Sequence, residues 1–334
     1  QMYPVVWDSI RTDVDHTTLK GQYILTGSAK SSEGETMHTG TGRISRVLMR
    51  PMSLFESNES TGEVSFADIL EGKDISGVSK LSLDDLANII VRGGWPASIN
   101  VKSDLKYSFV KEYVKSLIHE EAKNPLKMQS VLRSLSRNIS TQVSNSTIEN
   151  DIKNTFDTDI SRPTLTDYLN TLEKLFVIED VNATNLNFRS KYALRTKPKK
   201  YFVDPSIATA VLDMKPSDLI NDLNTFGFMF ESLCMRDLKV YTQSYDGNIS
   251  FYRDETDFEV DAIVRTTSGK WGAIEIKLGA GYIEEAARNL LKFKERVDTN
   301  KCGEPSFLMV LTGANYSYKR EDGVYVVSIG TLKN

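Results

Sequence analysis

In the C-terminal part of the chain, the order of apolar and polar residues predicts an α/β arrangement of helices and strands. Residues 258–265 (FEVDAIVR) and 270–278 (KWGAIEIKL) have the apolar and β-branched composition of strands, and the turn residues Thr266 to Gly269 between them predict a hairpin. Amphipathic segments flank this hairpin, and two more apolar runs predict further strands. The expected order is helix, strand, strand, helix, strand and strand, at residues 227–241, 258–265, 270–278, 283–297, 307–311 and 324–329.

The middle of the chain, residues 102–201, has a mostly helical pattern. A helix start signal lies at residues 161–164, and short strands are expected at residues 176–178 and 201–203. Helices followed by a two-stranded hairpin form the outline of a winged helix-turn-helix. The helices are expected at residues 107–119, 126–138, 148–156 and 164–175.

The beginning of the chain is expected to form a helix at residues 5–14, a short apolar strand at residues 22–26 and then a polar loop. Another helix is expected at residues 83–92, because the Gly-Gly-Trp-Pro step at residues 93–96 ends it. We place a domain boundary near residue 100 and a second one after the predicted hairpin. The three expected domains are residues 1–100, 101–215 and 216–334.

The length and composition agree with several globular domains, because 334 residues with 40% apolar and 26% charged side chains supply more than one core. The net charge of −4 argues against a protein that coats nucleic acid indiscriminately, so any DNA contact must come from a local basic patch. The two cysteines, Cys234 and Cys302, argue against a disulfide framework or a structural zinc site. The small number of cysteines fits a reducing cytoplasm, so we expect a cytoplasmic protein. No apolar run is long enough to span a bilayer and no signal peptide opens the sequence, so we expect no membrane partner.

A basic segment precedes the strand at residues 201–203. On the hairpin of a winged helix, its cations would contact DNA phosphates and add affinity that depends on salt but not on sequence. The alternative is a protein-docking winged helix whose cations are merely solvated. The candidate nucleic-acid residues are Arg189, Lys191, Arg195, Lys197, Lys199 and Lys200.

Charged residues interrupt the two apolar strands of the predicted hairpin. Asp261 lies in the first strand, and Glu275 and Lys277 lie two positions apart in the second, so the latter two point to the same face. Two carboxylates on neighbouring strands could bind Mg²⁺, and a lysine beside them could orient a water molecule or stabilise a developing negative charge. Glu259 shares the face of Asp261 and either joins this site or faces solvent. The alternative is a buried salt bridge kept for fold specificity, or the relic of a lost active site.

These residues resemble the PD-(D/E)XK nuclease-like core, in which an acid and an E-x-K sequence lie on adjacent strands behind a helix that carries another acid. The matching positions are Asp261, Glu275 and Lys277, with Glu231 on the preceding helix. The resemblance implies an α/β domain with Glu231, Asp261, Glu275 and Lys277 as catalytic residues, and Asp261 and Glu275 as metal ligands. The family also contains many inactive members, so the motif is a hypothesis about activity.

A second resemblance covers nearly the whole chain. The ordered segments ILTGSA (24–29), GRI (42–44) and RPMSLFE (50–56), followed by GGWP, YLNTLEKLFVIED, KKYFVDPSIA and the acids of the nuclease-like core, resemble a bacterial and archaeal AAA+-type ATPase family with a C-terminal domain of unknown function. In this resemblance, Ser28 would sense the γ-phosphate of ATP, and Arg43 would be an arginine finger. The alternative for Arg43 is an exposed loop cation. An arginine finger that acts in trans would imply a homo-oligomer.

The chain departs from an ATPase in one respect, because it contains no G-x-x-x-x-G-K-[ST] sequence. Without the backbone amides and the lysine of such a loop, we expect no ATP binding or hydrolysis by this chain itself. The expected fold is therefore an α/β multidomain chain with part of a P-loop ATPase core and lid, a winged helix-turn-helix and a PD-(D/E)XK nuclease-like domain. ATP would belong only to the complete protein, with the P-loop half in a preceding segment.

Three functions from different classes follow from these observations. The first is a DNA-associated C-terminal part of an AAA+-type ATPase, which binds DNA or a partner through the winged helix and the nuclease-like domain. The second is a metal-dependent DNA endonuclease that uses Asp261, Glu275 and Lys277. The third is a protein-interaction scaffold in which both folds have lost their chemistry.

Overall fold

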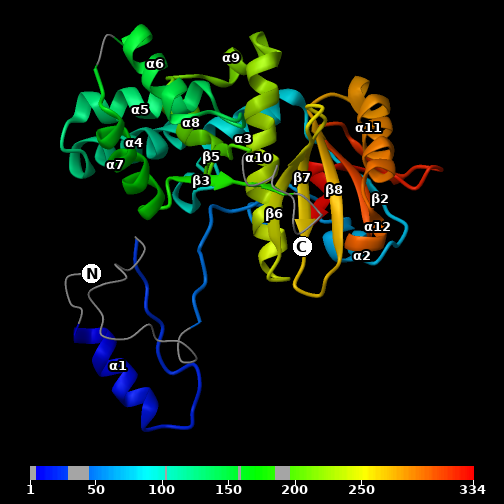
Figure 1. The fold of residues 1–334 in the computed structure, drawn as a ribbon, viewed down its shortest axis with the longest axis horizontal. Helices are drawn as coiled ribbons and strands as arrows, with labels where there is room; N and C mark the ends of the chain where they lie inside the picture. The colour runs from blue at the N-terminus through cyan, green and yellow to red at the C-terminus, as the bar shows by residue number, and fades with distance from the viewer. Residues whose placement is uncertain (1–4, 29–44, 102–103, 157–158, 185–195) are drawn as a thin grey trace.

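The computed structural model describes residues 5–28, 45–101, 104–156, 159–184 and 196–334 (Figure 1). The α-helices are α1 (Val5–Asp15), α2 (Phe66–Leu70), α3 (Leu83–Arg92), α4 (Ser108–Glu121), α5 (Pro125–Arg137), α6 (Asn145–Phe156), α7 (Arg162–Lys174), α8 (Pro205–Val211), α9 (Pro216–Asn221), α10 (Leu223–Gln243), α11 (Ile283–Arg296) and α12 (Thr299–Cys302). The strands are β1 (Val64–Ser65), β2 (Ser76–Val78), β3 (Ile178–Val181), β4 (Ala183–Thr184), β5 (Lys199–Phe202), β6 (Asn248–Arg253), β7 (Glu259–Arg265), β8 (Trp271–Lys277), β9 (Phe307–Thr312), β10 (Tyr316–Lys319), β11 (Tyr325–Ser328) and β12 (Leu332–Lys333).

A mixed sheet of eight strands forms the C-terminal part, in the order β2-β10-β11-β9-β8-β7-β6-β4. β8, β9 and β11 run parallel, whereas β6, β7 and β8 form an antiparallel meander whose β7–β8 turn contains Gly269 at a φ of +86°. Glycine is favoured there because this backbone conformation costs it little. The helices and the mixed sheet confirm the expected α/β class, while the P-loop, winged-helix and nuclease assignments stay predictions.

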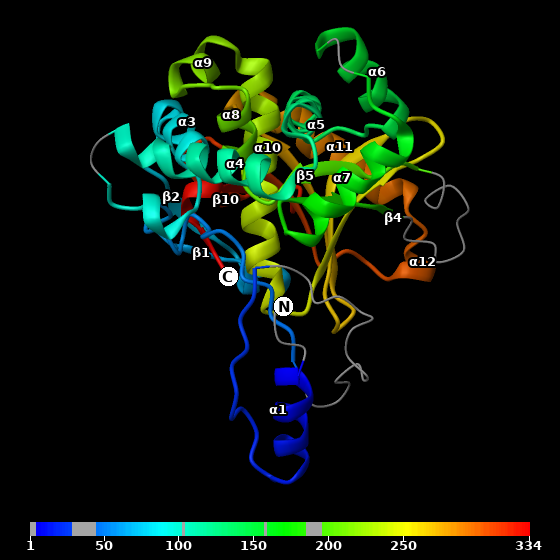
Figure 2. The ribbon, with the colours of Figure 1, turned by 90° about the vertical axis from the view of Figure 1, so that its left-hand side faces the viewer.

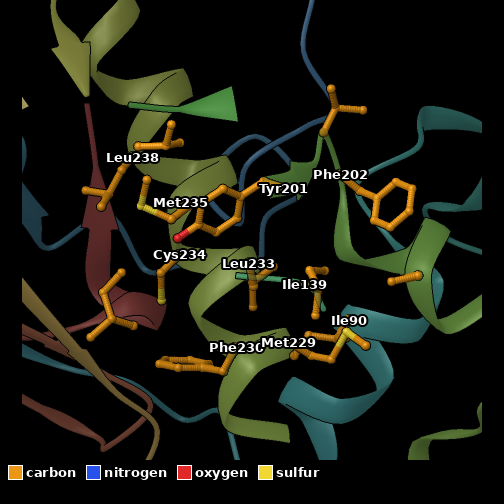
Figure 3. Packing of buried hydrophobic residues seen from close by; sticks show 14 of the residues in the cluster. Ile90, Ile139, Tyr201, Phe202, Met229, Phe230, Leu233, Cys234, Met235 and Leu238 are labelled. Atoms are coloured by element: carbon orange, nitrogen blue, oxygen red, sulfur yellow. The ribbon is translucent and has the colours of Figure 1, made fainter. Parts of the chain in front are cut away.

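The long helix α10 lies between the helical part of the molecule, which contains α3 to α9, and the large sheet (Figures 1 and 2). It contacts β6 and β8 of the sheet and also α3, α8 and α9. Figure 3 shows its buried side chains, among them Met229, Phe230 and Leu233, in one apolar cluster with Ile90 and Phe202 from the helical part. Since burial of apolar surface is the main favourable term in folding, α10 joins the two parts through a shared core.

Residues 50–98 pack against the C-terminal sheet. β2 is the edge strand beside β10, and β1 pairs with β12. α3 begins with a capping box between Ser82 and Asp85 and ends at Gly93, as the sequence pattern predicts. The proposed boundary near residue 100 therefore follows a segment that supplies a strand to the same sheet as strands β6 to β11 of residues 248–328.

Some elements differ from the sequence-based expectations. Residues 22–26, expected to form a strand, belong to no helix or strand of the described structure, and the segment that follows α1 lies apart from the large sheet (Figure 1). α9 was not among the expected helices; Pro216 begins it at its first position. β10 was not expected, because four residues of the sequence Tyr-Ser-Tyr-Lys carry little apolar signal.

A buried arginine holds four distant segments together. Arg236 on α10 pairs with Asp237 at 2.7 Å and with Asp204 at 2.9 Å, and its side chain is 1% exposed. Asp204 also accepts the backbone N–H of Gly94 at 2.9 Å and caps α8, while Asp237 accepts the backbone N–H of Leu54 at 2.9 Å. The segments around residues 54, 94, 204 and 236 therefore meet at one ionic group.

The close approach of these segments explains the Gly-Gly step, because a Cβ atom on Gly94 would lie 2.2 Å from the carbonyl oxygen of Met52 and 2.9 Å from Nη1 of Arg236. Gly94→Ala is therefore expected to destabilise the protein by roughly 2–3 kcal/mol, because neither the backbone of residue 52 nor the buried guanidinium can move away easily. Urea denaturation measures the effect.

The matched control is Gly227→Ala, since its Cβ atom would meet nothing within 4 Å on helix α10. This control should gain about 0.5–1 kcal/mol from helix propensity. Equal stability of the two variants would contradict this account of Gly94.

Candidate functional site

The structure brings together the four residues that the sequence analysis selected for the nuclease-like site. Glu231 comes from α10, Asp261 from β7, and Glu275 and Lys277 from β8. Nζ of Lys277 lies 2.8 Å from Oε2 of Glu275 and 3.4 Å from Oδ2 of Asp261. Glu259 on β7 belongs to the same group, which we call the carboxylate cluster (Glu231, Glu259, Asp261 and Glu275).

The end of the β7–β8 ladder positions Asp261. The paired residues of this ladder run from Arg265 and Trp271 to Ala262 and Ile274. Beyond Ile274, the backbone N–H of residue 276 donates to Oδ2 of Asp261 at 2.8 Å in place of a strand partner. The backbone therefore holds Oδ2 of Asp261 at the point where the two strands separate. The other carboxylate oxygen, Oδ1, is available for further contacts.

A lysine from outside the predicted motif lies in the carboxylate cluster. Nζ of Lys199 on β5 lies 2.7 Å from Oε1 of Glu259, 3.2 Å from Oε1 of Glu231 and 3.8 Å from Oδ1 of Asp261. Its side chain is only 5% exposed. The hydroxyl of Tyr201, two positions further along β5, donates to Oε1 of Glu231 at 2.6 Å. β5 therefore supplies both an ammonium group and a hydroxyl to the cluster.

Neutral and cationic side chains complete the hydrogen bonds of the cluster. Asn289 on α11 donates to Glu275 and also to the backbone carbonyl of Glu259. Gln142 and Arg253 donate to Oε2 of Glu259 at 3.2 and 3.1 Å. Buried charges are tolerated only with such partners, and the hydrogen bonds that satisfy these carboxylates come from the helical part, α11 and β6.

Burial and the neighbouring charges shift the pKa values of the cluster in opposite directions. Burial, together with the charge of Asp261, raises the pKa of Glu275 to about 7. Burial also raises the pKa of Glu231. Burial acts in the same direction on Asp261, but Lys277, Lys199 and the N–H of residue 276 outweigh it and lower the pKa of this carboxyl. Burial disfavours the charged form of Lys199, yet the surrounding carboxylates raise its pKa.

The arrangement does not fit the divalent metal ion that the nuclease-like motif implies. Among the described residues, no group of three or more His, Cys, Asp or Glu side chains is placed to hold a metal ion. The ammonium group of Lys199 lies where a cation between Glu231, Glu259 and Asp261 would have to bind. Mg²⁺ takes oxygen ligands in a near-ideal octahedron, and a buried ammonium among those oxygens prevents this geometry.

The basic segment is only partly consistent with DNA contact. Lys199 and Lys200 are buried, and Lys200 pairs with Asp180 at 2.8 Å, so neither side chain is available to DNA phosphates in this structure, contrary to the expectation. Both side chains point into the molecule because β5 is covered on both faces. Lys197 is exposed. The remaining candidates, Arg189, Lys191 and Arg195, lie outside the described residues.

The two residues expected to act on ATP are not brought to the carboxylate cluster. Ser28 is exposed at the end of the segment 16–28, which follows α1, and Arg43 lies outside the described residues. Their roles stay predictions. In the part of the chain that the structure describes, no helix combines the length and apolar character that crossing a bilayer requires.

Comparison with protein families gives two matches. Residues 226–332 match a domain of unknown function, DUF4143. This domain is often found in AAA-ATPase-associated proteins. Residues 83–218 match a second domain of unknown function, DUF8612. Neither of these two matches is to an ATPase family, and a comparison with curated proteins gives no match.

The DUF4143 match contains every residue of the predicted nuclease-like motif, whereas Lys199 and Tyr201 belong to the DUF8612 match. The sequence analysis missed these two residues as members of the cluster, because it treated Lys199 as part of an exposed basic run. A signal was present, since residues 199 and 201 share one face of a strand by the period of two. The sequence alone does not reveal which face of β5 meets α10.

The raised pKa of Glu275 predicts a pH-dependent loss of stability. The folded chain holds this proton up to about pH 7, while the unfolded chain releases it near pH 4.5, so the folded chain binds more protons and its stability falls as pH rises between these values. Glu275→Gln should remove this component, which is at most on the order of 3 kcal/mol. The test is the difference in unfolding free energy between variant and wild type at pH 5 and pH 8. An identical difference at both pH values would show that Glu275 does not titrate in this range.

Proposed function

We propose that this chain is the DNA-associated C-terminal part of an AAA+-type ATPase, and that its carboxylate cluster contributes to binding without cutting DNA. The observation that carries the proposal is the ammonium group of Lys199 among Glu231, Glu259 and Asp261. A cluster that is closed to divalent metal lacks the Lewis acid that a nuclease of this class would use. It is also largely neutralised, which removes much of the repulsion that four carboxylates would exert on DNA phosphates.

The association with an ATPase is supported by the segment near α1. Ile24 and Met49 are 89% and 90% exposed, and Leu19 and Val47 are also exposed. Exposed apolar residues gathered on extended segments are typical of surfaces that bind another protein unit. Ile24 lies within the segment 24–29 and Met49 directly precedes the segment 50–56, two of the segments that carry the resemblance to the ATPase core. The DUF4143 match agrees with an ATPase-associated role. Because the sequence has no P-loop, ATP hydrolysis by this chain alone is not part of the proposal.

DNA association is supported by the local charge of residues 189–197. This segment carries four cations and no acid in a chain with a net charge of −4. In the sequence it lies between β4 of the large sheet and β5, the strand that carries Lys199 of the neutralised cluster. Phosphate contacts of this kind give an affinity that falls steeply as the salt concentration rises.

Reversal of charge in the basic segment tests this proposal. Arg189→Glu with Lys191→Glu is expected to weaken the binding of a duplex oligonucleotide at least about tenfold at low salt and to reduce the salt slope by about 2. The matched control is Arg288→Glu with Lys292→Glu, which makes the same charge change on the exposed face of α11. Fluorescence anisotropy over a salt series measures both variants. Equal effects of the two pairs would reduce the interaction to net charge and refute the specific segment.

A cleavage assay tests the second half of the proposal. The folded wild type is expected to leave single- and double-stranded DNA intact in Mg²⁺ and in Mn²⁺, because Lys199 closes the cluster. Glu275→Ala and Lys277→Ala are the controls for any residual cutting. Cleavage that both substitutions abolish would contradict a non-cleaving role and make the chain a metal-dependent nuclease.

A further inference from the structure

We propose that Lys199 is a built-in counter-cation that keeps the carboxylate cluster closed to divalent metal ions as long as β5 is docked against α10. The inference rests on the non-cleaving half of the proposed function and deepens it, because it names the condition under which the cluster stays closed. It does not depend on whether the chain binds DNA. It begins with the disagreement between the nuclease-like motif, whose four residues are present, and the space among Glu231, Glu259 and Asp261, which holds the ammonium group of Lys199.

The contacts of Lys199 are those of a bound cation. Its Nζ is within 4 Å of carboxylate oxygens from Glu231, Glu259 and Asp261, and these oxygens come from two different elements. The lysine reaches them from a third element, β5, and its Nζ lies 5.5 Å from the centroid of the Phe251 ring. A lysine on a solvated surface has no such set of partners, and the burial of this one fixes the ammonium group in place.

The charges of the cluster explain why a divalent ion would replace the lysine. Four carboxylates face three cations, because Lys277 pairs with Glu275 and Asp261, and Arg253 pairs with Glu259. Loss of Lys199 would leave two carboxylate charges without a counter-charge, and oxygens of carboxylates are the ligands of Mg²⁺ and Mn²⁺. Lys277 stays beside the site in both states, because it is on the same strand as Glu275.

The position of Lys199 in the chain makes the closure conditional. β5 belongs to the separate two-stranded sheet β3–β5, not to the large sheet that carries Asp261 and Glu275. Tyr201 on the same strand donates to Glu231, and Gln142, which forms an isolated β-bridge with Lys199, donates to Glu259. Movement of β5 away from α10 would therefore withdraw the ammonium group and the Tyr201 hydroxyl from the carboxylates together.

The test is Mn²⁺ binding to the full chain, measured by calorimetry and by the shift in melting temperature. Wild type is expected to show no saturable binding, whereas Lys199→Met should bind Mn²⁺ at least about tenfold more tightly and be stabilised by it. Lys200→Met is the matched control, because Lys200 is the neighbouring buried lysine of β5 but pairs with Asp180 outside the cluster. Lys199→Met combined with Asp261→Asn should lose the gained affinity.

Each outcome decides the question. Saturable Mn²⁺ binding by wild type that Asp261→Asn removes would overturn the proposal, as would a folded Lys199→Met that gains no affinity. Equal gains in Lys199→Met and Lys200→Met would overturn it too. If Lys199→Met folds only when Mn²⁺ is present, the metal has taken the place of the ammonium group, which supports the proposal. If Lys199→Met folds in neither condition, the titration of wild type decides by itself, with absence of binding in support and binding at Asp261 against.

Discussion

A buried cation that needs partners from distant segments is the constraint on which the rest of this structure depends. The guanidinium of Arg236 is almost completely buried, and a charge in that position is stable only with both Asp204 and Asp237 beside it. Asp204 can serve only if α8 begins where it does, and Asp237 also holds the backbone of Leu54. The four segments meet because any other arrangement would leave a charge in the interior without a partner.

Helix α10, which carries Arg236, also carries a second buried ionic group, to which it supplies the acid instead of the cation. Glu231, five positions before Arg236 on α10, supplies an acid to Lys199 from β5, whereas Arg236 supplies a cation to Asp204. Between them, Leu233, Cys234 and Met235 belong to the apolar core shown in Figure 3. Apolar packing thus joins the helical part to the large sheet, with one ion cluster at Glu231 and another at Arg236. The hydrogen-bonded ion pairs fix the relative position of the packed elements more closely than apolar packing alone.

The parts of this molecule that the sequence predicted are those whose signal is local. Helices α3 and α11 follow from apolar spacing and end signals, and Asp261, Glu275 and Lys277 follow from an acid and an E-x-K sequence on strands of period two. Glu231 follows from the resemblance to the nuclease-like core, as the acid on the preceding helix. Lys199 could not be assigned in this way, because its role depends on which face of β5 meets α10, a contact between segments that are far apart in the chain. The expected strand at residues 22–26 shows the same limit, since a strand exists only beside a partner.

The carboxylate cluster shows why a motif and the chemistry of its site are separate properties. All four motif residues lie together with hydrogen-bonded geometry, yet a side chain from another part of the fold determines whether a metal ion can enter. An apolar residue in place of Lys199 would leave the carboxylates of Glu231, Glu259 and Asp261 facing one another. Burial already raises the pKa of Glu231 and Glu275. Such a group must take up protons, a metal ion or an ammonium group, because like charges at this distance cannot all remain ionised without a counter-charge. In the folded chain the counter-charge is the ammonium group of Lys199. Whether the cluster is closed to metal ions therefore depends on the docking of β5.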